Sequence, residues 1–161
     1  MCIRDSYPVT ARPVATGAGI TIATSSGWMI IGPDGSAAHV GGAAFGSVGA
    51  PIVSIGGSLI AYSADGVVYV AGINDPGSPL GPGILYSGGF GAGYAFATSG
   101  EQLVVSSAGG LALYTIFGEP LGSVDSGVSI AAPYWIEDRI YFLAVGDATT
   151  LRVISASAIF A

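Results

Sequence analysis

This chain of 161 residues contains one histidine, one cysteine and no lysine, so three of the residue types most used as general bases or nucleophiles are scarce or absent. His39 is the single histidine, and a histidine base needs a partner that orients it, such as a nearby carboxylate. It lies in the segment SAAHV, which reads as the outer strand of a β-sheet unit. We therefore expect an edge-strand histidine without a catalytic role, whose replacement by alanine leaves any activity unchanged.

The acidic residues also read as structural. Glu137 and Asp138 are neighbours, and because neighbouring side chains in a strand point to opposite sides, they cannot easily share one substrate. We expect them in a solvated turn. Asp34, Asp65 and Asp75 each stand beside Gly or Pro, where a carboxylate can cap the N–H groups of a turn. The sequence contains no D-x-D-x-D-G calcium loop, so it predicts no catalytic and no metal-binding residues.

Composition narrows the classes of partner. Charged residues make up 9% of the chain, and four basic residues against ten acidic ones give a net charge of -6. No basic stripe is left to neutralise phosphates, so we expect no nucleic-acid partner. The single cysteine, Cys2, allows neither a disulfide framework nor a thiolate metal cluster. Apolar runs are far shorter than the roughly 18 residues of a membrane helix, so no membrane-spanning segment is expected.

One pattern recurs along the chain. The segments GITIATSSGWMII, SLIAYSADGVVYV and QLVVSSAGGLALY align without gaps at residues 19–31, 58–70 and 102–114. A weaker copy with a longer turn, RIYFLAVGDATTLRVIS, starts its strand at Ile140. In this gapless alignment one column holds Ile20, Leu59 and Leu103, and another holds Gly27, Gly66 and Gly110. The unit is a pair of strands joined by a glycine turn, and it repeats about every 40 residues.

Each copy is flanked by further short strands. Three of the upstream strands are opened by Pro13, Pro51 or Pro133, and proline fits the first residue of a strand. Downstream, GPDGS, NDPGS and GEPLGS have the composition of turns. About 40 residues holding four strands is typical of a β-propeller blade. Stacked blades also explain why the strands are apolar on both faces, since each blade lies between two neighbours.

We therefore predict an all-β chain: a β-propeller of about four blades, each of three to four antiparallel strands, arranged as an open arc or partial ring. The expected blades cover about residues 11–47, 48–90, 91–129 and 130–161, after a non-native or disordered leader at residues 1–10. Ten residues are expected to be buried between the blades: Leu59, Ile60, Val68, Val70, Leu103, Val105, Leu111, Leu113, Ile140 and Phe142.

The repeat pattern A-P-x-V-x-x-G-G-x-[LI]-x-x-x-S-x-D-G-x-[VL]-Y resembles that of pyrroloquinoline-quinone-type β-propellers over roughly residues 11–155. That group includes quinoprotein alcohol dehydrogenases and outer-membrane assembly propellers. Its quinone-binding members carry docking tryptophans near blade ends, a calcium site and often adjacent cysteines. Here Trp28 and Trp135 fall inside strands and there is no cysteine pair. We therefore expect no quinone, calcium or other cofactor. The resemblance implies a periplasmic, cell-envelope or extracellular location, with the cytoplasm as the alternative.

The ends of the chain suggest a fragment. The opening MCIRDS matches no blade column and resembles translated sequencing-adapter DNA, so we expect residues 1–6 to be an artefact and the native protein to extend upstream. The resemblance implies rings of about six to eight blades. The missing blades of the same chain are therefore expected partners, and the isolated chain is expected to self-associate or to be poorly soluble.

A ligand is expected on the rim where blade connections and the turns between second and third strands meet. That rim would display residues 41–49, 87–93 and 125–131. The candidate ligand-binding residues are Phe45, Asp65, Phe90, Tyr94 and Asp147. The leading functional hypothesis is a non-catalytic scaffold that binds a protein or a small molecule. The alternatives are part of a quinoprotein-type or other propeller enzyme whose catalytic blades lie outside this chain, and a structural repeat array without a ligand.

Overall fold

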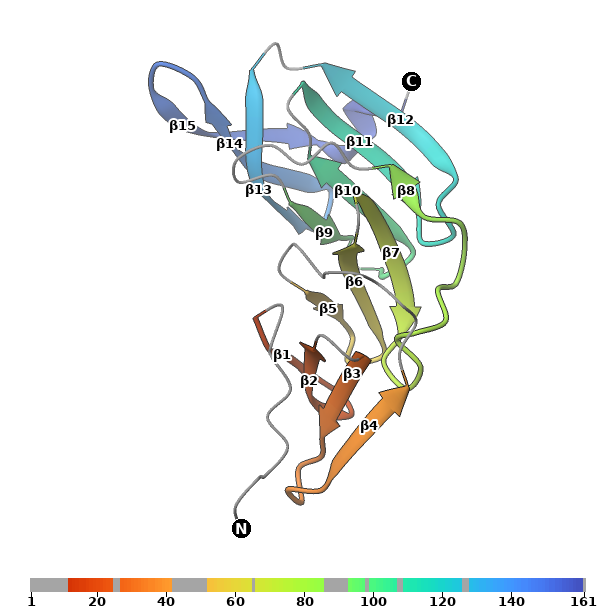
Figure 1. Cartoon of the computed structure of the whole chain (residues 1–161). Coiled ribbons are helices and arrows are strands. Elements are labelled where there is room, and N and C mark those ends of the chain that lie inside the picture. Colours follow the sequence, from red (N-terminus) through yellow and green to blue (C-terminus); the bar gives the residue numbers. More distant parts are fainter. Residues whose placement is uncertain are drawn as a thin grey trace.

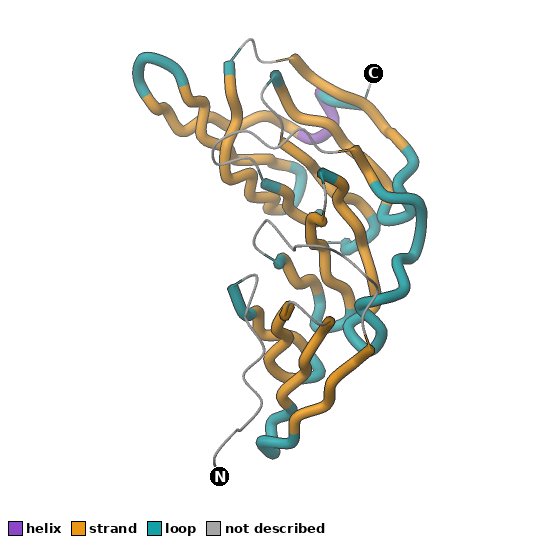
Figure 2. The backbone as a smooth tube through the Cα atoms, viewed as in Figure 1, coloured by secondary structure: helices purple, strands orange, loops and turns teal. Residues whose placement is uncertain are grey.

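The computed structural model of the chain is built almost entirely of β-strands (Figures 1 and 2). The structure describes residues 12–24, 27–41, 52–64, 66–85, 93–97, 99–106, 109–125 and 128–160. Within these ranges the one helical element is a short 3-10 turn, η1 (Ala156–Ala158). The all-β prediction is confirmed. No helix among the described residues is long and apolar enough to cross a membrane.

Four antiparallel sheets follow one another along the chain, each built from consecutive strands in sequence order. The first sheet holds β1 (Val14–Thr16), β2 (Gly19–Thr24), β3 (Gly27–Ile31) and β4 (Ala37–Gly41). The second holds β5 (Val53–Ile55), β6 (Leu59–Ala64), β7 (Val67–Gly72) and β8 (Ile84–Leu85). The third holds β9 (Tyr94–Phe96), β10 (Gln102–Ser106), β11 (Gly110–Thr115) and β12 (Pro120–Asp125). The fourth holds β13 (Ser129–Ile136), β14 (Arg139–Val145) and β15 (Thr149–Ser155).

The sheets stack face to face, and an apolar cluster fills each of the three interfaces. On β6, Ile60 and Tyr62 pack against the first sheet, whereas Ala61 between them packs toward the third. Alternate residues of one strand thus serve two different interfaces. This arrangement confirms the explanation given for strands that are apolar on both faces.

The strand register corrects the alignment of the second repeat by one residue. Ile20 pairs with Ile31 and Leu103 with Tyr114. In the second sheet the residue with the same spacing to its partner is Ile60, which pairs with Ala71, and not Leu59. A slip of one residue exchanges the two faces of a strand. Accordingly Leu59 is half-buried, while the other nine residues expected in the core are buried as predicted.

The glycines that align at the hairpin turn are required for different structural reasons. Gly66 follows the end of β6 with φ +78°, a left-handed conformation that favours glycine. Gly110 begins β11, and a Cβ there would lie 2.1 Å from the carbonyl oxygen of Val124 on β12. A side chain is therefore excluded by backbone conformation in one repeat and by close strand packing in the other.

The stack curves into an arc (Figure 1). The first strands β1, β5, β9 and β13 line its concave side, and the last strands β4, β8 and β12 lie on the convex side. Successive first strands contact one another, β1 with β5, β5 with β9 and β9 with β13. The approach is close: the N–H of Gly17 donates to the carbonyl of Gly57 at 2.9 Å. The four sheets are blades of a β-propeller, arranged as an open arc with its axis on the concave side.

Candidate functional site

A groove of about 300 Å³ lies on the concave side of the arc. Three strands from three successive sheets form its walls: β5, β9 and β13. Its lining consists of Val53, Ser54, Ile55, Tyr94, Ala95, Phe96, Pro133, Tyr134 and Trp135. A site shared by three blades depends on their stacking, because no single sheet supplies more than one wall.

A β-bulge in β13 shapes one wall of the groove. The pairing with β14 shifts between Ala131 and Tyr134, and Ala132 has φ 47°, a left-handed conformation that costs a non-glycine residue about 1 kcal/mol or more. A proline fits a bulge because the unpaired residue needs no N–H. The prediction that Pro133 opens its strand is therefore wrong, since it lies within β13. The bulge also brings Pro133 next to Gly93, whose Cβ, if present, would lie 3.3 Å from the proline ring.

Aromatic side chains line much of the groove. Tyr94, Phe96 and Trp135 are each less than 10% exposed, whereas Tyr134 is 64% exposed. The indole Nε1 of Trp135 donates a 2.9 Å hydrogen bond to the carbonyl of Glu137, which fixes the orientation of the ring. Tyr and Trp combine apolar surface with a polar group, a composition common at binding surfaces.

The polar groups of the groove are hydroxyls. Ser54 is half-buried on β5, and the tyrosines at positions 94 and 134 supply the other two side-chain hydroxyls. Among the described residues that line the groove, none is Asp, Glu, His, Lys, Arg or Cys. The groove lining thus offers apolar and aromatic surface together with three hydroxyl groups.

The buried Tyr62 has a structural role elsewhere in the chain. The hydroxyl of Tyr62, between the first and second sheets, donates to the carbonyl of Pro76 at 2.9 Å, and its ring meets Trp28 edge to face at 4.9 Å. Burial raises the pKa of Tyr62 above its usual range, and the nearby Tyr69 and Asp75 raise it further. All these contacts lie away from the concave groove.

The expected turn roles of two acidic sites are confirmed. Asp34 accepts hydrogen bonds from the hydroxyl of Ser36 at 2.6 Å and from its N–H at 2.9 Å, and these bonds lower the pKa of Asp34. Glu137 and Asp138 form the exposed turn between β13 and β14. Asp138 lies 4.0 Å from Arg139 with both side chains largely exposed, a kind of pair that contributes little to stability.

The residues predicted for the rim are not brought together in the described structure. Phe45, Asp65 and Phe90 lie outside the described residues. Tyr94 is buried on β9 and lines the concave groove instead of projecting from a loop. Asp147 lies in the exposed turn between β14 and β15. His39 lies on β4, the last strand of its sheet, opposite Met29, which agrees with its predicted place on an outer strand.

Comparison with known proteins places this fold among β-propellers. No family model matches the sequence, and no curated protein matches it. The backbone is similar to that of Ika4, a computationally designed protein, with TM-score 0.67 and 16% identity over 96% of this chain and 95% of Ika4. It is similar to apo AztD from Citrobacter koseri, with TM-score 0.72 and 14% identity over 94% of this chain and 45% of AztD.

A third similar structure is the WD40 domain of Pan2 from Neurospora crassa. Its TM-score is 0.57 and its identity 13%, over 92% of this chain and 47% of the Pan2 chain. This chain thus spans about half the length of AztD and of the Pan2 domain. At these identities the likeness establishes the propeller fold alone.

Proposed function

We propose that this chain acts as a non-catalytic propeller scaffold that binds a partner in the concave groove. The observation that carries the proposal is the groove itself, which three successive blades line with aromatic rings and hydroxyls. Its volume of about 300 Å³ is at the lower end of the range for ligand pockets. It suits one apolar or aromatic group, carried by a protein segment or by a small molecule.

Selection of peptides from a random phage library on the full chain tests this proposal. We expect enrichment of peptides that contain an aromatic residue, and a Kd at least tenfold weaker for the variants Tyr134→Ala and Ser54→Arg. Phe117→Ala is the matched control, because Phe117 is an aromatic residue, 52% exposed, in the turn between β11 and β12. Equal binding by all variants, or selection of peptides without aromatic residues, would refute the groove as the site.

The rim residues predicted from the sequence provide a second, separable hypothesis. Of the predicted rim residues that the structure describes, Asp147 is the one that lies exposed in a turn. If the rim and not the groove binds the selected peptides, Asp147→Ala weakens binding while Tyr134→Ala does not. The two sites are thereby distinguished in one set of titrations.

The alternative function is part of a propeller enzyme with its catalytic residues in further blades. The observation that favours it is that this chain spans about half the length of natural propellers of similar backbone. The sequence of a longer native protein discriminates between the two functions. Additional blades with docking tryptophans and a vicinal cysteine pair would support the enzyme.

We also propose a location in the bacterial cell envelope or outside the cell. The support for this proposal is the resemblance of the repeat to that of quinone-type propellers. Immunoblotting of fractionated source cells tests it, and recovery of the protein in the cytoplasm would contradict it.

A further inference from the structure

The three interfaces inside the arc are built from the same strand positions. The central hairpins of the second, third and fourth sheets each turn one equivalent residue toward the preceding sheet: Ile60, Leu103 and Ile140. Each of these side chains is 0% exposed. The next residues of β6 and β10, Ala61 and Val104, face the following sheet and are also fully buried. Each middle sheet therefore uses one set of alternate residues toward the sheet before it and the other set toward the sheet after it.

The first sheet carries the residues for a preceding neighbour, although none of the described elements packs there. Ile20 is the equivalent of Ile60 by its register, yet it is 47% exposed. Its partner Ile31 lies on the same face, as does the pair of Ile22 and Met29. We call these four residues, Ile20, Ile22, Met29 and Ile31, the head face. All four are apolar and uncharged.

The fourth sheet carries the complementary face at the other end of the arc. Tyr134 lies opposite Tyr141, Tyr141 opposite Val153, and Leu143 opposite Leu151. We call these five residues the tail face; within it, Leu151 is 70% exposed and Val153 53%. A sheet with one wet face normally has polar residues there. The middle of this face is apolar instead, with Arg139 and Thr149 at its two ends, and exposed apolar patches of this kind mark contact sites.

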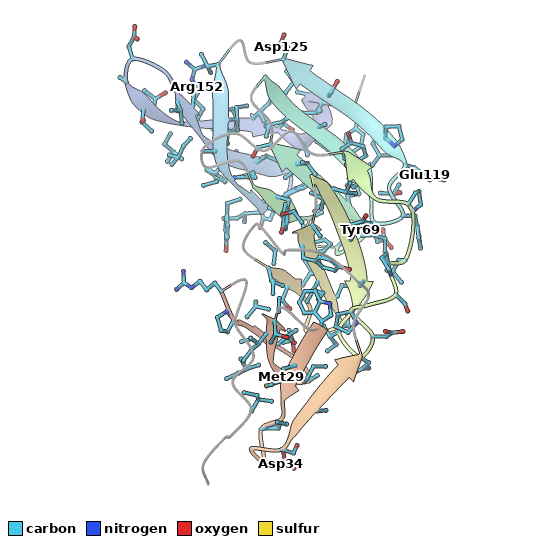
Figure 3. The ribbon with its side chains drawn as sticks, in the orientation of Figure 1. Met29, Asp34, Tyr69, Glu119, Asp125 and Arg152 are labelled. Carbon is cyan, nitrogen blue, oxygen red and sulfur yellow. The ribbon has the colours of Figure 1, made fainter. Side chains whose placement is uncertain are left out.

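We propose that the tail face of one copy packs on the head face of a second copy, and that two copies close into one ring. This contact would reuse the residue positions of the three internal interfaces. The two faces lie at opposite ends of the arc, as the positions of Met29 on β3 and Arg152 on β15 show (Figure 3). Such a head-to-tail contact forms a ring when the rotation between copies closes.

The lengths of the similar propellers indicate a second copy as the occupant. AztD and the Pan2 domain are matched over 45% and 47% of their chains, so each of these two chains holds about twice this length. Ika4, matched over 95% of its chain, shows that an arc of this extent also exists as a separate polypeptide. Two copies would supply what one longer chain supplies in the natural proteins.

Closure would also complete the concave side. Within one copy, β1 contacts β5, and β9 contacts β13. By the same packing, β13 of one copy would lie beside β1 of the second, which would enclose the concave side on which the groove opens. The groove and the tail face share Tyr134, but the pairing test changes Ile20 and Leu151, which do not line the groove, so it can be read separately from the peptide experiment.

Sedimentation equilibrium with two complementary charge variants tests the proposal. We expect the full chain to show twice the 15.9 kDa mass of one copy. Ile20→Lys and Leu151→Glu each place an unpaired charge in both contacts of the ring, so each should raise the dimer Kd about a hundredfold or more. Mixed together, the two variants form one native contact and one Lys–Glu contact, and the mass should return to that of two copies.

Phe117→Glu is the matched control, because it charges an exposed apolar residue that belongs to neither end face. It should leave the dimer Kd within about twofold. The single variants change residues that are already exposed, and circular dichroism confirms that they keep their sheet. A monomeric wild-type chain, unlimited growth of the oligomer, failure of the mixed variants to associate, or equal disruption by Phe117→Glu would each overturn the proposal.

Discussion

Ile20 and Ile60 occupy the same place in two copies of one hairpin, and their surroundings differ. Ile60 lies between two sheets and is fully buried, whereas Ile20 lies on the end of the stack and is 47% exposed. Their hairpins have the same register: Ile20 pairs with Ile31 and Ile60 with Ala71, each the same number of residues further along the chain. The burial of a propeller strand therefore comes from its neighbours in the stack and not from its own hairpin. Substitutions in interior sheets and in end sheets should accordingly differ in their effects.

The largest expected difference is between two leucine truncations. Leu103→Ala removes a side chain that is 0% exposed between the second and third sheets, and should lower the free energy of unfolding by about 2–5 kcal/mol. Leu151→Ala removes a side chain that is 70% exposed on the tail face, and should cost less than about 1 kcal/mol in the monomer. Urea denaturation at low protein concentration measures both values. Equal losses would mean that the interior sheets are not stacked.

The interface between the first two sheets should respond to high pH through Tyr62. Burial raises the pKa of Tyr62 in the folded chain above the ordinary value of 10.0. The stability linked to this phenol is thus fully present below pH 10 and is lost as the pH rises further, because the unfolded chain then loses the proton first. Tyr62→Phe should lower the free energy of unfolding at neutral pH by about 1 kcal/mol, since the carbonyl of Pro76 loses its donor.

The same variant should also flatten the decline in stability above pH 10. Thermal melts of wild type and Tyr62→Phe across the alkaline range measure this difference. An identical alkaline decline in the two proteins would show that Tyr62 is not buried in the way described.

The bulge in β13 should give a smaller effect of opposite sign. Ala132 has φ 47°, a conformation that glycine adopts without strain, so Ala132→Gly should raise the free energy of unfolding by up to about 1 kcal/mol. The neighbouring Ala131→Gly is the control: this alanine is buried and lies outside the left-handed region, and the change should destabilise the chain. Destabilisation by both changes to a similar extent would argue against the bulge.

The smallest expected effects concern the sequence-based predictions that His39 is not catalytic and that neither quinone nor calcium binds. His39→Ala should leave the peptide affinity of the groove unchanged, because His39 lies on β4 at the opposite edge of its sheet from β1. Titration calorimetry of the full chain with pyrroloquinoline quinone or with calcium should show no binding in the micromolar range. Micromolar binding of either ligand would favour the enzyme alternative.

Much of the fold follows from local patterns in the sequence. Glycine turns between apolar runs at Gly27, Gly66 and Gly110 predict the central hairpin of the first three blades. The fourth hairpin is longer, as predicted, but because its strands β14 and β15 are longer, and its turn is no longer than the one between β10 and β11. The exception is instructive. A gapless alignment equates Leu59 with Ile20, but Gly66 lies inside its turn while Gly27 already begins a strand. Because strands have a period of two, this single residue exchanges the faces of β6.

The candidate groove was less accessible to sequence reasoning. A proline after two alanines reads as the start of a strand, and nothing local shows that Pro133 occupies a bulge within β13. The glycine-rich segment before Tyr94 predicts a place for this residue on the rim, whereas the structure makes it part of the groove lining because β9 is the first strand of its sheet. Which strands meet across three blades depends on stacking, and stacking is not encoded in any one repeat.

The central claim is that the head face and the tail face are two halves of one interface. Hydrogen–deuterium exchange measured over a range of protein concentrations tests it most directly. Amides of β6 and β10, which are covered on both sides, should exchange slowly at every concentration. Amides of β2, β3, β14 and β15 should gain protection together as the concentration rises, while the turn around Phe117 stays unchanged. Protection of the end sheets that is independent of concentration, or that appears at one end alone, would contradict the claim.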